Sequence, residues 1–296
     1  MIMRNRERMY SHSALLLTAF IFGSNYWISK DLTGKIPVEA LVVFRTAGAA
    51  LLFWLFAKKS GDIPPAKDIV LLLTAGVIGV AVNQLFFFSG LKLSNPVNVS
   101  IIHITNPFFV VIFSRIILRG KITALRIAGI VLGFTGAAIL ILKGSAAGFQ
   151  SAQMKGYLFI LINTTAYALY LVIIKPLLKK YSTFTLLKWV YLGGALVVIP
   201  YGFGSLNQIS YSSLNAGVWL SLLYIIVAVT FLAYLLSAYA LRKLSPPVVS
   251  FYVYLQPLFA TVIALMLKKD VLAFYQLIAA ALIFTGVYLV NDRSKA

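Results

Sequence analysis

The chain has 296 residues, of which 61% are hydrophobic and only 11% are charged, and its mean hydropathy is +0.93. Soluble globular proteins contain about 45–50% apolar and roughly 25% charged residues, so this composition excludes a soluble fold. The apolar residues form runs long enough to cross a bilayer as helices, and the roughly 10-residue alternating segments of a membrane barrel are not seen. The sequence therefore predicts an all-α integral membrane protein.

The net charge of +19 arises from 26 Lys and Arg residues against 7 Asp and Glu residues. In a soluble protein this excess would suggest nucleic-acid binding, but in a membrane protein basic loops set the orientation in the bilayer. We therefore expect the lipid bilayer, and no nucleic acid, as a partner of the chain. The sequence contains no cysteine, which excludes disulfides and thiolate chemistry.

Ten apolar runs are predicted to be transmembrane helices. The first run follows Arg4, Arg6 and Arg8 and has no small-residue cleavage site, so we expect it to be retained as a span. Gly and Pro residues separate most of the runs. The predicted spans are 12–30, 37–57, 69–91, 96–117, 123–142, 155–178, 184–203, 215–240, 246–267 and 272–291.

The positions of the basic residues predict the orientation. With the N-terminus inside, 17 Lys and Arg residues fall on the inner side and 7 on the outer side, whereas Arg45 and Lys188 fall within spans. Since cytoplasmic loops are enriched in basic residues, both termini are expected in the cytoplasm, with the protein in the plasma (inner) membrane.

The sequence repeats itself at a spacing of 150 residues. Pro96 and Pro107 match Pro246 and Pro257, and the Phe-Thr-Gly triplet at 134–136 recurs at 284–286. Each copy holds five spans, and because five is odd the second copy enters the membrane from the opposite side. The sequence therefore predicts two inverted five-helix repeats, at 12–142 and 155–291, with a binding site between them near the middle of the membrane.

These features resemble the EamA branch of the drug/metabolite transporter superfamily. The resemblance rests on the two repeats, the Gly23-Ser-Asn opening of the first span, Pro37 followed by Arg45, and the Asn106-Pro107 and Gln256-Pro257 pairs. It implies a ten-helix fold with cytoplasmic termini and a central cavity lined mainly by helices 1, 3, 4, 6, 8 and 9. It also implies transport of amino acids, other small metabolites or drugs.

Polar residues deep in the spans are the candidate solute-binding residues. At 100° per residue, Asn98, His103 and Asn106 share one face of the fourth span, and they line either a cavity or an interhelical contact. Pro107 and Pro257 each remove a backbone donor and are predicted hinges that free a carbonyl group. The other candidates are Asn25, Tyr26, Asn83, Gln84, Tyr167, Tyr170, Tyr234, Tyr252 and Gln256.

Several residues are open to two interpretations. His103 is either a proton carrier or a neutral donor in a packed site, and the lack of nearby ligand residues argues against a metal. Arg45 either extends to the outer interface or serves the cavity or an inter-span contact, whereas Lys188 is expected to extend to the cytoplasmic interface. Gly129 and Gly133 permit close helix approach, within the chain or in a homodimer.

These patterns favour an alternating-access carrier of a small organic solute over an enzyme. All seven acidic residues fall in loops or at span ends, which favours facilitated diffusion or exchange over carboxylate-based antiport and argues against a strongly cationic solute. Aromatic faces with amide donors suit an amino acid or another amphipathic metabolite. We expect an exporter without a cofactor or catalytic group. The alternatives are an uptake permease or exchanger for a nucleotide-like or sulfonium metabolite, or a drug efflux protein.

Overall fold

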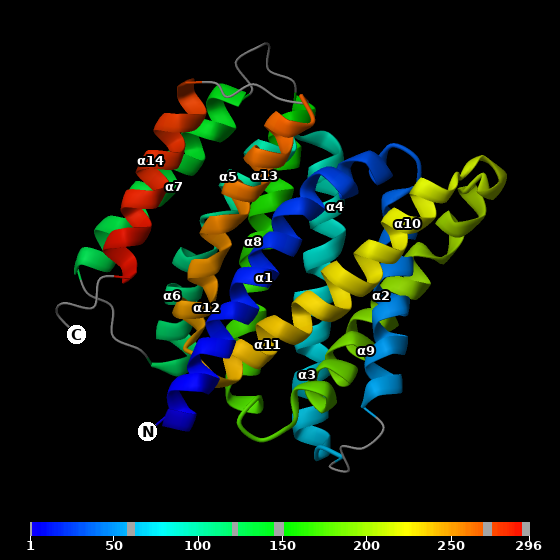
Figure 1. The fold of residues 1–296 in the computed structure, drawn as a ribbon, viewed down its shortest axis with the longest axis horizontal. Helices are drawn as coiled ribbons and strands as arrows, with labels where there is room; N and C mark the ends of the chain where they lie inside the picture. Colours follow the sequence, from blue (N-terminus) through cyan, green and yellow to red (C-terminus); the bar gives the residue numbers. More distant parts are fainter. Residues whose placement is uncertain (1, 58–62, 120–123, 145–150, 269–273, 292–296) are drawn as a thin grey trace.

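The computed structural model describes residues 2–57, 63–119, 124–144, 151–268 and 274–291 (Figure 1). All of the regular structure in these ranges is helical. The expectations placed on Lys58, Lys59, Gly61, Lys121, 145–148, Lys269, Arg293 and Lys295 lie outside them.

The first half of the chain follows the predicted spans closely, but two of its spans are not uniform α-helices. A π-helical segment, η1, interrupts the third predicted span, and the fourth is broken between His103 and Asn106. The elements are α1 (Ile2–Thr33), α2 (Val38–Phe56), α3 (Ala66–Gly76), η1 (Val77–Val82), α4 (Asn83–Leu93), α5 (Pro96–His103), α6 (Asn106–Leu118) and α7 (Ala124–Gly144).

The second half shows the same two irregularities at corresponding places. A π-helical segment, η4, interrupts the eighth predicted span, and a short 3₁₀ helix, η5, divides the ninth. The elements are α8 (Ser151–Leu177), α9 (Thr183–Gly202), the 3₁₀ helices η2 (Phe203–Gln208) and η3 (Tyr211–Ser213), α10 (Ala216–Tyr224), η4 (Ile225–Leu232), α11 (Ala233–Lys243), α12 (Pro246–Phe251), η5 (Tyr252–Tyr254), α13 (Leu255–Met266) and α14 (Phe274–Asn291).

Local signals in the sequence explain where the helices begin and break. The Asn95 side chain accepts a hydrogen bond from the Val97 backbone N–H at 2.7 Å, and Pro96 occupies the first turn of α5. Pro107 and Pro257 likewise lie in the first turns of α6 and α13, where the missing N–H costs little. The fourth and ninth predicted spans are therefore interrupted just before these prolines.

Seven helical segments within the described residues are long and apolar enough to cross a membrane. Large apolar side chains are exposed along their outer faces, including Leu55, Leu196 and Leu220, as expected for a surface that contacts lipid. The seven segments are Val38–Phe56, Ala66–Leu93, Pro96–Leu118, Ala152–Leu177, Thr183–Gln208, Ala216–Lys243 and Pro246–Met266.

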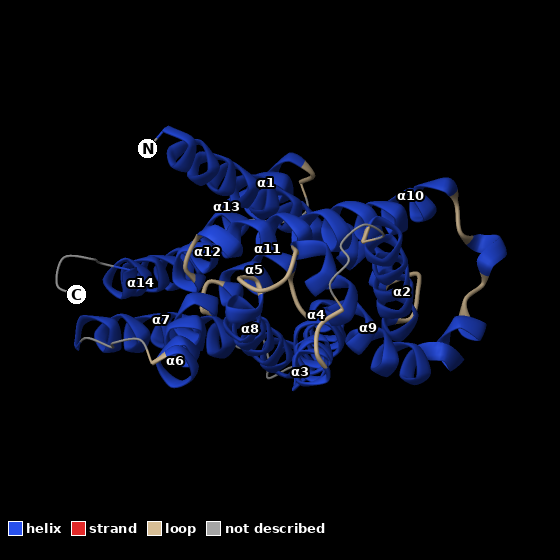
Figure 2. Cartoon of the chain, turned by 90° about the horizontal axis from the view of Figure 1, so that it is seen from below, coloured by secondary structure: helices blue, strands red, loops and turns tan. Residues whose placement is uncertain are grey.

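The first helix of each half packs against the other half. α1 contacts α11 and α13, whereas α8 contacts α4 and α6. This exchange places α1 against segments of the second half and α8 against segments of the first half, and Figures 1 and 2 show how the two halves are arranged.

α7 and α14 form a separate pair at the edge of the molecule (Figures 1 and 2). Their backbones approach so closely that a Cβ atom on Gly286 would lie 2.4 Å from the Gly129 carbonyl oxygen and 2.8 Å from the Gly133 nitrogen. The small residues of these two helices therefore serve contacts within the chain, which is one of the two roles expected for them.

Candidate functional site

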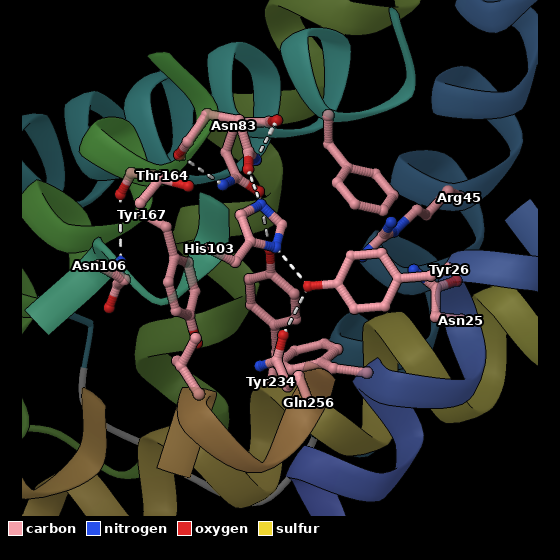
Figure 3. Close-up of a pocket in the computed structure, with 14 residues that line it drawn as sticks. Asn25, Tyr26, Arg45, Asn83, His103, Asn106, Thr164, Tyr167, Tyr234 and Gln256 are labelled. Atoms are coloured by element: carbon pink, nitrogen blue, oxygen red, sulfur yellow. Dashed lines mark hydrogen bonds between the residues drawn. The ribbon is translucent and has the colours of Figure 1, made fainter. Parts of the chain in front are cut away.

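A polar cavity lies between the two halves at the centre of the helices (Figure 3). It offers about 70 Å³ to the centres of water molecules, where one water needs roughly 10–15 Å³. α1, α2, α4, α5, α6, α8, α11, η5 and α13 contribute its walls. The lining residues are Phe22, Asn25, Tyr26, Arg45, Asn83, Phe87, His103, Asn106, Asn163, Thr164, Tyr167, Tyr234, Val253 and Gln256.

The cavity lies near the middle of the helical segments that line it. Thr164 is central in α8, and Gln256 is central in the segment Pro246–Met266. His103 and Asn106 lie on either side of the break in the segment Pro96–Leu118, close to its midpoint. Irregular backbone at this depth is tolerated because it lies against a cavity rather than against lipid.

Tyr26 links the two halves across the cavity. Its hydroxyl group is hydrogen-bonded to His103 Nδ1 of α5 and donates to Gln256 Oε1 of α13 at 2.8 Å. The other ring nitrogen of the histidine, Nε2, lies 2.5 Å from Asn163 Oδ1 of α8. A single tyrosine hydroxyl therefore joins a group from each half, and both nitrogens of His103 are engaged.

A pair of asparagines extends this network to α4 and α11. Asn163 Nδ2 donates to the Asn83 carbonyl oxygen at 2.7 Å, and Asn83 Nδ2 donates to the Asn163 carbonyl oxygen at 3.1 Å. The Tyr234 hydroxyl donates to Asn83 Oδ1 at 3.2 Å. These reciprocal bonds hold α4 against α8, so the amides position the helices as well as facing the cavity.

The hydrogen-bond pattern is compatible with two protonation states of His103. When Tyr26 donates to Gln256, both ring nitrogens of His103 must donate, which requires the cation. When the Gln256 amide instead presents its N–H to Tyr26, the tyrosine donates to Nδ1 and a neutral ring suffices. The geometry therefore keeps open both roles expected for His103, proton carrier and neutral donor.

Arg45 faces the cavity and does not extend to the membrane interface, so that interpretation of the sequence is wrong. Its side chain is only 4% exposed, and its Nε donates to Thr230 Oγ1 at 2.6 Å. Thr230 Oγ1 in turn donates to the Ile225 carbonyl oxygen at 2.7 Å, five residues earlier in the π-helical η4. The Arg45 guanidinium carbon lies 5.6 Å from the centroid of the Phe88 ring. These contacts place a positive charge at the cavity wall.

Two buried oxygen atoms of the lining have no hydrogen-bond partner among the residues that the structure describes. They are Asn106 Oδ1 and Thr164 Oγ1, on side chains that are 2% and 1% exposed. Asn106 uses its amide nitrogen to donate to the Thr164 carbonyl oxygen at 3.1 Å. Because buried polar atoms are nearly always satisfied, an unpartnered acceptor and hydroxyl beside a cavity are suited to a bound solute.

The structure brings together eight of the twelve predicted solute-binding residues. Asn25, Tyr26, Asn83, His103, Asn106, Tyr167, Tyr234 and Gln256 line the cavity. The other four lie elsewhere: the Asn98 amide donates to the Tyr157 hydroxyl, Gln84 Oε1 accepts from Thr46, Tyr170 packs against Gly79, and the Tyr252 hydroxyl contacts His12 Nδ1 at 2.7 Å.

Several lining residues are not among the twelve solute-binding residues predicted from the sequence, although Asn163 and Thr164 were noted as polar residues of the sixth span. Asn163 and Thr164 are polar residues in the middle of an apolar run, which was a usable signal. Phe22 and Phe87 carried no such signal, because an aromatic residue in a span is compatible with lipid, core or cavity. Val253 occupies the position 150 residues after His103, so the two halves present different side chains at this point.

A second, smaller cavity of about 20 Å³ lies beside the first. It shares Phe22, Tyr167, Val253 and Gln256 with the central cavity and extends to Leu15 and Tyr252. Since Leu15 lies in the N-terminal half of α1, the second cavity leads from the centre toward the face where the chain begins.

Lys188 lies over aromatic rings rather than against the cavity. Its Nζ is 5.1 Å from the centroid of the Trp54 ring and 5.9 Å from that of Trp189. Lys188 is therefore a second basic residue within a span, outside the polar site.

Comparisons with known proteins agree with this architecture. Residues 9–142 and 154–292 each match the EamA-like transporter family. An uncharacterized transporter of Archaeoglobus fulgidus is 28% identical over 96% of this chain and 98% of the relative. The uncharacterized transporter YyaM of Bacillus subtilis is 25% identical over 92% of this chain and 91% of its own.

A more distant relative carries a specific name. The pseudopaline exporter CntI of Pseudomonas aeruginosa is 24% identical over 62% of this chain and 63% of its own. A crystal structure superposes with a TM-score of 0.68 over 97% of this chain and 98% of the other, at 18% identity, which shows a shared fold. On the family match, which covers both halves, this chain belongs to the EamA-like transporter family of the drug/metabolite transporter superfamily, and it is a multi-pass membrane transporter rather than an enzyme.

Proposed function

We propose that this transporter exports a small organic solute, an amino acid or another small metabolite, and that the central cavity binds it. The observation that carries the proposal is the cavity itself, at mid-depth, between the two halves, with polar atoms left without partners. Tyr26 bonds to groups of both halves across it, so movement of one half relative to the other would open or close the site. Solute binding would then favour one arrangement of the halves over the other.

The proposed architecture is ten transmembrane helices arranged as two inverted repeats, 12–142 and 155–291. Two lysines in corresponding places support it. Lys30 Nζ, at the end of α1, donates to the carbonyl oxygens of Leu91 and Ser94 at 2.8 and 2.9 Å. Lys175 Nζ, at the end of α8, donates to the carbonyl oxygens of Leu241 and Leu244 at 2.5 and 2.7 Å. Leu241 and Leu244 lie 150 residues after Leu91 and Ser94, respectively. α1 and α8 run in opposite directions in Figure 1, as an inverted repeat requires.

The proposed location is the plasma membrane, with both termini in the cytoplasm. The beginning of α1 and the end of α14 are each the lower end of their helix in Figure 1. The excess of basic residues predicts that this side is cytoplasmic. The second cavity leads toward the same side, so it marks the route by which a cytoplasmic solute would reach the centre.

The alternative solutes fit the cavity less well. A sulfonium metabolite is a cation, and the cavity wall carries the guanidinium of Arg45. A nucleotide is the bulkiest of the candidate solutes, and the cavity has room for only about five to seven waters. The name of the pseudopaline exporter supports outward transport among relatives of this chain.

The test is solute exchange in proteoliposomes. Purified protein is first screened by thermal shift against amino acids, nucleotides, sulfonium compounds and amphipathic drugs, because a ligand that binds only the folded state raises its stability. Solutes that bind are then tested for counterflow by the wild type, by Asn106→Ala and by Ser100→Ala. Ser100 is a matched control, since its hydroxyl bonds to the Val97 carbonyl within the same helical segment and does not line the cavity.

We expect Asn106→Ala to reduce counterflow at least tenfold and Ser100→Ala to leave it nearly unchanged. The proposed site is wrong if both variants exchange solute at the wild-type rate. The proposed function is wrong if no solute in the screen is exchanged by the wild type.

A further inference from the structure

The charge of Arg45 has no counter-charge among the described residues. The two ion pairs found there join Lys180 to Asp68 and Lys243 to Glu7, at the ends of helices. A guanidinium has five N–H donors, and the hydrogen bond from Arg45 Nε to Thr230 uses one of them. A charge buried in a membrane protein is costly unless it is paired, and such charges usually serve a function.

The Arg45 side chain is fixed rather than free to leave the cavity. Thr230 Oγ1 accepts from its Nε while donating to the Ile225 carbonyl oxygen, and the guanidinium lies over the Phe88 ring. Figure 3 shows the Arg45 side chain directed into the cavity beside Tyr26. With Nε held, the remaining N–H donors are available as the planar fork that binds a carboxylate with two parallel hydrogen bonds.

We propose that the transported solute carries a carboxylate and that this group binds Arg45, an inference that rests on the function proposed above. Asn106 and Thr164 lie on the other side of the cavity from Arg45 in Figure 3. Their unpartnered oxygens, Oδ1 and Oγ1, provide acceptors for an ammonium or hydroxyl group of the same solute.

The solute class that meets these conditions is a small amino acid or hydroxy acid with an apolar body. Its carboxylate neutralises Arg45, and its donor group faces Asn106. The rings of Phe22, Phe87 and Tyr167 line the space for its apolar part.

The test compares acids with their amides. The full-length protein in detergent is titrated with L-phenylalanine, L-leucine, L-serine and 3-hydroxybutyrate, and with the carboxamide of each, and binding is read as thermal stabilisation. The variants are Arg45→Gln, Arg45→Lys and the control Lys188→Gln. Lys188→Gln also removes one positive charge from within a span, but away from the cavity.

We expect at least one acid to bind the wild type about 10- to 100-fold more tightly than its amide, the usual range for a hydrogen bond to a charged group. Arg45→Gln should abolish this preference and Lys188→Gln should keep it. Arg45→Lys should prefer the acid but bind it more weakly, because an ammonium lacks the planar fork.

The inference is overturned if no acid binds the wild type more tightly than its amide, or if folded Arg45→Gln keeps the preference. If Arg45→Gln does not fold, the preference for acid over amide in the wild type and in Arg45→Lys decides between the outcomes. Exchange of neutral or cationic solutes without any preference for acids would refute the carboxylate inference and leave the carrier function standing. If no solute of any kind is exchanged, both are wrong.

Discussion

Tyr26→Phe is the substitution that most selectively weakens the contact between the two halves. It removes one oxygen atom and keeps the ring, whose centroid lies 6.0 Å from that of Phe87. The lost hydroxyl bonds to His103 of the first half and to Gln256 of the second. Packing is therefore nearly unchanged, while the hydrogen-bonded bridge across the cavity is lost.

The size of the effect follows from the one hydrogen bond that joins the halves. The bond from Tyr26 to His103 lies within the first half, whereas the bond to Gln256 crosses to the second. That bond contributes about 1 kcal/mol net, so the arrangement seen here should lose about 1 kcal/mol relative to one in which the halves have separated at this point. That corresponds to a roughly fivefold shift in the ratio of the two populations.

The absence of cysteine from the sequence makes the shift measurable with a single introduced thiol. Val253→Cys is a suitable reporter, because Val253 lines both cavities and is 8% exposed. We expect Tyr26→Phe to raise the rate at which a membrane-impermeant maleimide labels this cysteine from at least one face by about fivefold. The control is Tyr191→Phe, since the Tyr191 hydroxyl donates within the second half, to the Thr230 carbonyl oxygen at 3.4 Å.

An unchanged labelling rate in Tyr26→Phe, with both proteins folded, would show that the bridge does not hold the halves together. Equal acceleration by Tyr26→Phe and Tyr191→Phe would show a general loosening of the fold rather than the loss of this contact.

Two further substitutions test the packing. Gly76→Ala should lower the midpoint of thermal unfolding, at a cost of about 1–3 kcal/mol, because the new Cβ would lie 1.9 Å from the Val190 carbonyl oxygen. The control is Gly204→Ala, since a Cβ at that position would have no neighbouring atom within 4 Å. Equal midpoints in the two variants would contradict the close contact at Gly76. Lys175→Met should also lower the midpoint of thermal unfolding, because it removes the hydrogen bonds from the ammonium group to two carbonyl oxygens at the end of α11. A hydrogen bond to a charged group contributes about 1.5–3 kcal/mol. The control is Lys179→Met, at an exposed position, which should leave the midpoint unchanged. An equal fall of the midpoint in both variants would refute a specific role for Lys175.

The fold was readable from the sequence wherever a simple physical rule applied. Apolar runs predicted the helices, and Pro107 and Pro257 predicted where two of the spans are interrupted. The π-helical segments η1 and η4 were not predicted, because an extra residue in a helical turn leaves no mark on composition or periodicity. Their consequence is large, since the η4 segment places the Thr230 hydroxyl against Arg45.

The site was less readable because each polar residue had several possible partners. Asn98 was assigned to the same face as His103 and Asn106 on the assumption of an unbroken helix. The break after His103 invalidates that assumption for Asn106, which begins the next helix, and within α5 itself the Asn98 amide bonds to Tyr157. The position of Arg45 depended on Thr230, 185 residues away, a contact that spacing along the chain does not reveal.

The central claim, that one cavity between the halves is opened alternately to the two sides of the membrane, is tested most directly with the Val253→Cys reporter in the otherwise wild-type chain. The cysteine is labelled with impermeant maleimide from the cytoplasmic face and from the opposite face, with and without a solute found in the binding screen. The account predicts labelling from both faces, slowed by the solute in each case. Labelling from one face alone, at a rate that the solute does not change, would contradict it.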